Sequence, residues 1–158
     1  STLTYSSVGG QLQYKQTYPQ GDYVIAVLEI KNSAIYLKEL DYYGTDGKLF
    51  SMAVYLPSAL LHPNQFTGSI SSTSTVQGKD GSGATITTFT ETRTFTNLGT
   101  ETITVPAGTF SADKVRITTS ETLNNTIETE TVWLALGVGT IRQTSPGSSS
   151  ELSTYVVK

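Results

Sequence analysis

The chain contains no cysteine and few charged residues. The first absence excludes disulfide bonds, a catalytic thiolate and zinc sites with thiolate ligands. Only 15% of the 158 residues are charged, with ten Lys and Arg, thirteen Asp and Glu, and a net charge of −3. Because nucleic-acid binding needs a dense cationic surface, we expect no nucleic-acid partner. No run approaches the roughly 20 apolar residues of a membrane-spanning helix, so we expect no transmembrane segment.

Groups able to catalyse a reaction are also few. His62 is the only histidine, it lies in an expected loop, and no cysteine or Gly-x-Ser-x-Gly elbow accompanies it as a nucleophile. Two charged pairs, Glu128 with Glu130 and Glu91 with Arg93, lie two residues apart on expected strands. This alternation is typical of a solvated strand face. We therefore expect no enzymatic activity, no catalytic residue, no bound metal ion and no cofactor.

The chain is rich in residues with hydroxyl side chains and in glycine. The chain has 27 Thr, 18 Ser and 14 Gly, and Thr favours strands because its branched Cβ suits a pleated surface. Short turns at regular spacing predict an all-β antiparallel meander, folded as a curved sheet, a half-barrel or a sandwich. We expect at most one short helix, near Pro57–His62, because a proline suits a first helical turn. No shift in composition divides the chain, so we expect a single domain over residues 1–158.

The N-terminal segment predicts either a hairpin or a strand that is exchanged with another copy of the chain. Two glycines at positions 9 and 10 separate the expected strands Thr2–Val8 and Gln11–Thr17. Leu3, Tyr5 and Val8 form an imperfect apolar stripe, and no proline or lysine protects this strand as an edge. The glycines act either as a tight turn or as a hinge for strand exchange. We expect copies of this chain as a candidate partner, through these three residues.

Threonines alternate along the middle of the chain, from Thr88 to Thr96. Because side chains alternate across a strand, these threonines form a polar outer face of an expected strand at residues 84–96, and Phe89 and Phe95 point inward. A second strand is expected from Gly99 to Val105.

The sequence VPAGTF at Val105–Phe110 predicts a tight turn between two strands. Pro106 lacks an amide hydrogen and ends the first strand. Gly108 can adopt a positive φ angle, and Phe110 is an expected core residue of the second strand.

A second motif, WLALGVGTIR, begins at Trp133, the only tryptophan, and Gly137 and Gly139 predict a bend just after it. We expect Pro106, Gly108, Phe110, Trp133, Gly137 and Gly139 to be structural.

Together the two motifs resemble secreted bacterial domains of unknown function, which carry a VPAGTF-like turn and then a W-x-A-P-G-V-G-x-V-K segment. Leu136 stands where that family usually has proline. The resemblance covers about the last 60 residues and implies a secreted or cell-envelope location in a bacterium. These domains are distantly similar to the half-barrels of lipoprotein carriers.

Two function classes follow. The first is a non-enzymatic extracytoplasmic β-module with a structural, adhesive or self-assembly role, favoured by the low charge and the absence of a titratable cluster. The alternative is a carrier or binder of a lipid or other hydrophobic ligand in the cell envelope, which the similarity to lipoprotein carriers implies. A large apolar cavity would favour the carrier, and a filled core with an open terminal strand would favour assembly.

Overall fold

The computed structural model describes residues 2–8, 11–63, 65–136 and 138–152. In these residues the secondary structure consists of strands, with no helix. The strands are β1 (Thr2–Val8), β2 (Gln11–Thr17), β3 (Tyr23–Lys31), β4 (Ala34–Tyr43), β5 (Leu49–His62), β6 (Ser69–Asp80), β7 (Thr85–Val105), β8 (Gly108–Glu121), β9 (Thr126–Ala135), β10 (Gly139–Ser145) and β11 (Ser148–Glu151).

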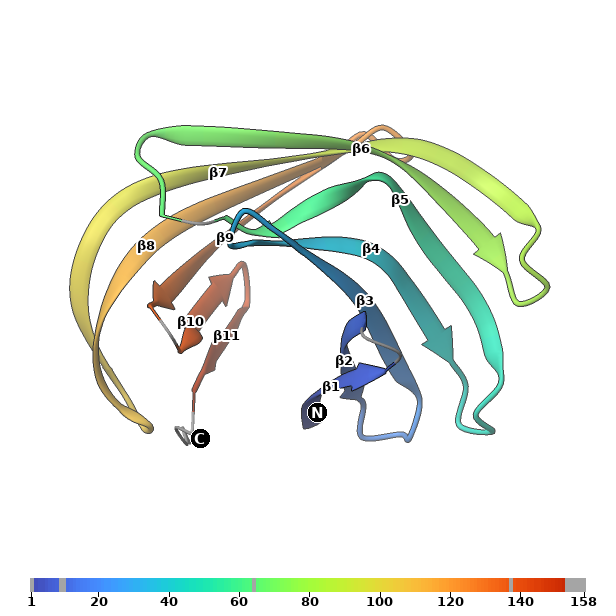
Figure 1. Ribbon diagram of the computed structural model, residues 1–158, viewed down its shortest axis with the longest axis horizontal. Coiled ribbons are helices and arrows are strands. Elements are labelled where there is room, and N and C mark those ends of the chain that lie inside the picture. Colours follow the sequence, from blue (N-terminus) through green and yellow to red (C-terminus); the bar gives the residue numbers. More distant parts are fainter. Residues whose placement is uncertain (1, 9–10, 64, 137, 153–158) are drawn as a thin grey trace. The chain divides into compact units, whose positions relative to one another are not determined.

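All eleven strands belong to one hydrogen-bonded sheet, and their order in the sheet is their order in the chain. The pairs from β1 to β6 and from β9 to β11 are antiparallel. Figure 1 shows how each strand turns back beside its predecessor, as β3, β4 and β5 do. The predicted all-β antiparallel meander is therefore confirmed.

The chain packs as two compact units. Unit 1 comprises residues 1–64, 72–92 and 121–125, and unit 2 comprises residues 65–71, 93–120 and 126–158. Strands β6, β7 and β8 each contribute residues to both units. The single domain expected over residues 1–158 stays a prediction.

The core of unit 1 lies on one face of strands β2 to β7. Buried residues of β3 alternate with half-exposed ones at its start, as expected where one sheet face is covered. The buried cluster consists of Ala26, Leu28, Leu37, Tyr55, Ala59 and Val76. Half-buried neighbours, among them Tyr14, Leu40 and Phe89, pack against it. Burial of apolar surface at roughly 25 cal/mol per Å² stabilises this arrangement.

The core of unit 2 combines residues from β7, β8, β9 and β10. Its buried members are Ile103, Val105, Ala112, Trp133, Ala135 and Ile141. Ala107, Phe110, Val138 and Leu152 pack against them. Trp133 is buried, with an exposed fraction of 7%.

The short helix allowed near Pro57–His62 does not form, because this segment is the second half of β5. Ala59 and Leu60 are buried and pair with β4, which satisfies the backbone without a helix. The register between β4 and β5 shifts between Leu37 and Glu39, opposite the stretch that contains Pro57. An irregular stretch of this kind accommodates a residue that cannot donate to the ladder.

Strand β7 is longer than the sequence predicts, because residues 85–105 form one strand rather than two. Gly99 adopts a φ angle of +105° within the strand and does not end it. The inward position of Phe95 is confirmed by its exposed fraction of 1%. In unit 2, the threonines of this strand pair with hydroxyls of β6, at 2.9 Å for Ser71 with Thr94 and 3.0 Å for Ser69 with Thr96.

Candidate functional site

The structure brings the two sequence motifs together in unit 2. Phe110 is the last residue of the VPAGTF motif and Val138 lies within the motif that begins at Trp133, and both pack against the buried cluster that contains Trp133. Pro106 lies between the end of β7 and the start of β8, where the sequence predicts the turn. Gly108 adopts a φ angle of +136°, which side-chain-bearing residues rarely adopt. The turn thereby places Phe110 against the core.

Polar groups surround the buried indole of Trp133. Its Nε1–H donates a hydrogen bond to Glu101 Oε1 at 2.5 Å, and Lys114 Nζ lies 3.7 Å from the same carboxylate oxygen. Lys114 Nζ also lies 5.1 Å from the centre of the indole, and the Arg142 guanidinium lies 5.7 Å from it. Cations at this distance are attracted to the face of an indole ring. We refer to Glu101, Lys114, Trp133 and Arg142 as the Trp133 cluster. In this cluster the indole is held by the hydrogen bond of its N–H and by the cations near its ring.

The chain that follows β11 closes the same region. Ala107 N donates to the Leu152 carbonyl at 3.1 Å, and Leu152 N donates to the Ile141 carbonyl at 2.9 Å. Arg142 Nε donates to Glu151 Oε1 at 2.7 Å, and its guanidinium also forms an ion pair with that carboxylate. These bonds attach the last described residues to the VPAGTF turn.

This arrangement is suited to packing rather than to ligand recognition. The indole is buried and its N–H is already bonded, so the ring offers no open face for stacking. Gly139 adopts a φ angle of +97°, and Gly137 lies outside the described residues. The structural role of the six motif positions stays a prediction.

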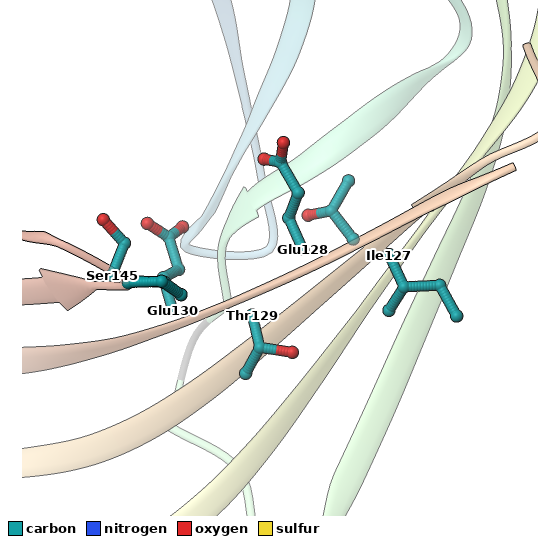
Figure 2. Close-up of a pocket in the computed structure, with 7 residues that line it drawn as sticks. Ile127, Glu128, Thr129, Glu130 and Ser145 are labelled. Atoms are coloured by element: carbon teal, nitrogen blue, oxygen red, sulfur yellow. The ribbon is translucent and has the colours of Figure 1, made fainter. Parts of the chain in front are cut away.

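A shallow depression in unit 2 holds the two glutamates that the sequence singles out. Its volume is about 450 Å³, and it is lined by Thr119, Ile127, Glu128, Thr129, Glu130, Ser145 and Pro146. Figure 2 shows Glu128, Glu130 and Ser145 on one side of the β9 ribbon, whereas Ile127 and Thr129 point to the other side. Glu128 is exposed, as the predicted solvated strand face requires.

The chemistry of this depression is limited. Gln143 Nε2 donates to Glu130 Oε2 at 2.6 Å, which leaves the Glu130 carboxylate beside an amide rather than a cation. In the part of the chain that the structure describes, no group of three or more His, Cys, Asp and Glu side chains could hold a metal ion. An exposed carboxylate and a half-buried one that is bonded to an amide do not by themselves define a catalytic site.

The prediction that Glu91 lies on a solvated face is wrong. Its exposed fraction is 4%, and Ser74 on β6 is equally buried at 1%. Thr73 and Thr92 are hydrogen-bonded across β6 and β7, so Ser74 and Glu91 lie opposite each other on the other face of the sheet. The sequence carries the signal, since Glu91 shares its strand parity with the inward-facing Phe89 and Phe95. Glu91 also contributes to raising the pKa of Tyr42, whose main cause is burial.

A second pair of acidic residues, Glu39 and Asp41, lies on one face of β4 and is not predicted from the sequence. Asp41 pairs with Ile25 of β3 and Met52 of β5, and these apolar neighbours partly remove its carboxyl from water. Burial, followed by a hydrogen bond and the charge of Glu39, raises the pKa of Asp41 to about 7. The Asp41 carboxyl therefore holds its proton to near neutral pH. The alternation of residues 39 and 41 in a strand is the signal that predicts the pair.

His62 lies at the end of β5 and not in a loop as expected, because it pairs with Ile35 of β4. Burial lowers the pKa of its imidazole. The neutral form of the ring is therefore favoured.

The predicted N-terminal hairpin is confirmed. β1 pairs with β2 from Thr2 with Thr17 to Val8 with Gln11. β1 is the first strand of the sheet order, so it is an edge of the sheet within the described residues. The side chains of Leu3, Tyr5 and Val8 lie outside the described residues, and their role in strand exchange stays a prediction.

These features define an all-β protein built from one antiparallel sheet. The core of unit 2 includes residues of both sequence motifs, and β1 in unit 1 is an edge strand among the described residues. The sequence matches the DUF3108-like family over residues 25–157, and the chain belongs to that family. No curated protein and no solved structure matches the sequence. Within the described ranges, no helix is long and apolar enough to cross a membrane.

Proposed function

We propose that this protein is a non-enzymatic extracytoplasmic β-module that self-assembles by adding a strand to its sheet at β1. The observation that carries the proposal is the place of β1 at the end of the sheet order, with β2 as its one neighbour among the described residues. An edge strand presents a row of backbone donors and acceptors that another strand can pair with.

The composition of β1 supports this role. Natural edge strands are usually protected by charges, prolines, bulges or short length. β1 has seven residues, none of them charged and none of them proline, and its register with β2 runs without a bulge. The low charge and the abundance of Thr and Ser support a location outside the cytoplasm.

The alternative, a carrier of a hydrophobic ligand, has weaker support. Its cavity would need apolar walls, whereas the depression in unit 2 is lined mainly by Thr, Ser and Glu. The buried indole of Trp133 packs against core residues of unit 2 rather than against a cavity.

Light scattering over a range of concentrations tests the proposal. We expect the mean mass of the chain to rise with concentration, and we expect Tyr5→Lys to abolish this rise, because an edge lysine opposes strand addition. The matched control is Ile86→Lys, which changes an exposed apolar residue on the interior strand β7. A strictly monomeric chain at every concentration would exclude self-assembly.

A further inference from the structure

The hydrogen-bonding pattern of β1 defines which of its backbone groups remain available. Val8 pairs with Gln11 across a two-residue connection. In hairpins of this length the pair that flanks the connection exchanges hydrogen bonds, and bonded pairs then alternate along the ladder. Thr2, Thr4, Ser6 and Val8 therefore bond toward β2. The outward-facing backbone N–H and C=O groups belong to Leu3, Tyr5 and Ser7.

At the other end of the sheet order, β11 has fewer backbone groups available for pairing than β1. β11 has four residues, and short edge strands resist pairing. Its last residue, Glu151, is bonded to Arg142 through its carboxylate. Leu152, directly after it, uses both its N–H and its C=O within unit 2. Head-to-tail pairing of β1 with β11 of another copy would thus find few free partners in the described chain.

We propose that β1 pairs antiparallel with β1 of a second copy, about a two-fold axis at Tyr5, to form a closed dimer. This inference rests on the proposed strand addition and specifies its partner and geometry. Tyr5 pairs with the partner's Tyr5, and Leu3 pairs with the partner's Ser7. The three outward-facing residues of each copy then all form hydrogen bonds, six in total by the antiparallel pattern, which gives about two per bonded pair.

Charge and symmetry favour a second copy as the occupant. Two-fold pairing at Tyr5 sets this position against itself, where a charge would meet a like charge. β1 carries no charge and avoids this repulsion. A two-fold contact also uses up both edges, so assembly stops at the dimer, whereas a head-to-tail contact would continue into a filament.

Cysteine crosslinking tests the geometry directly, because the chain has no native cysteine. Residues of a bonded antiparallel pair have Cα atoms about 5.5 Å apart, which is within disulfide range. We expect oxidised Tyr5→Cys to give mostly disulfide-linked dimer. Thr4→Cys is the matched control, since it lies opposite the partner's Ser6 and not opposite itself. A mixture of the Thr4→Cys and Ser6→Cys chains should crosslink, whereas neither chain should do so alone.

The outcomes separate the dimer from the broader proposal. If light scattering shows association but Tyr5→Cys crosslinks no better than Thr4→Cys, strand addition survives and the two-fold pairing is overturned. Crosslinking of both single variants to the same extent would indicate a parallel pair and also overturn it. A chain that is monomeric by light scattering and gives no crosslink overturns both. Circular dichroism of each variant checks that the sheet is retained.

Discussion

The two units differ in how they treat polar groups next to their cores. In unit 2, the indole N–H of Trp133 bonds to Glu101, and that carboxylate lies beside Lys114. In unit 1, three buried side-chain oxygens have no hydrogen-bond partner among the described residues: one each on Asp22, Asp41 and Ser74. An unpartnered buried polar group typically costs 1–3 kcal/mol of stability, by an order-of-magnitude estimate. The polar groups around Trp133 in unit 2 are therefore paired, whereas these three unpartnered oxygens lower the stability of unit 1.

The largest expected effect is in unit 2. Trp133→Ala should lower the free energy of unfolding by about 3–5 kcal/mol, because it removes a buried aromatic ring and leaves a cavity. Urea denaturation of the variant measures this change. Leu136→Ala is the control: Leu136 lies one residue after β9 and is 85% exposed, so its loss should change stability by less than about 0.5 kcal/mol. Equal effects of the two substitutions would contradict the central place of Trp133 in this core.

The VPAGTF turn should give the next largest effect. Gly108→Val should destabilise the protein by about 1–3 kcal/mol, because the φ angle of +136° strains a residue with a branched Cβ. Gly108→Ala separates strain from crowding: an added Cβ would meet the Phe110 ring at 3.8 Å, an ordinary contact. Thermal unfolding of both variants measures the two contributions. Full stability of the valine variant would show that this backbone conformation is not required.

Unit 1 should respond in the opposite direction. Ser74→Ala should stabilise the protein by about 1 kcal/mol, because it removes a buried hydroxyl that has no hydrogen-bond partner. Ser72→Ala, two residues earlier on the same strand, is the matched control. The Ser72 hydroxyl accepts a hydrogen bond from Leu60 N at 3.1 Å, so its loss should destabilise by about 1 kcal/mol. If both variants lose stability in urea denaturation, the contrast between the two units is wrong at this position.

How far the sequence predicts these features depends on the range of the interactions involved. Turn chemistry and strand alternation are local, so they predict the meander, the N-terminal hairpin and the inward position of Phe95. The predictions made from Pro57 and Gly99 are wrong, because both residues lie within strands. Pairing with neighbouring strands outweighs their local preference for a break. The hydrogen bond from Trp133 to Glu101 joins residues 32 positions apart, and only the assembled sheet brings them together.

Glu91 and the pair of Glu39 and Asp41 show a different limit. Strand parity predicts which side chains share a face, but it does not tell which face is covered. Carboxylates are rarely buried, so the sequence favours a solvated face for all three. The structure buries Glu91 among core residues and half-buries Asp41 between apolar neighbours. The burial of acidic side chains in unit 1 could therefore not be predicted from the sequence and is seen only in the structure.

The smallest expected effect concerns pH and tests this burial in unit 1. The pKa of Asp41 is about 7 in the folded protein against 3.8 for an ordinary Asp carboxyl, so the folded state binds the proton more tightly than the unfolded state. The stability that this proton provides is fully present below pH 4 and is lost as the pH rises toward 7. Because Asp41 is only partly buried and solvent screens its charge, we expect a loss of less than about 1 kcal/mol.

The difference in stability between the unaltered chain and Asp41→Asn isolates this contribution from the other titrating groups. The lowered pKa values of Glu29, Asp80 and His62 act in the opposite direction, favouring the folded state as the pH rises. These three contributions are common to both chains and cancel in the difference. Unfolding at pH 4, 5.5 and 7.5 should show that Asp41→Asn is relatively more stable at the highest pH. If the stability of Asp41→Asn instead runs parallel to that of the unaltered chain over this pH range, the pKa of Asp41 is not raised in the folded protein.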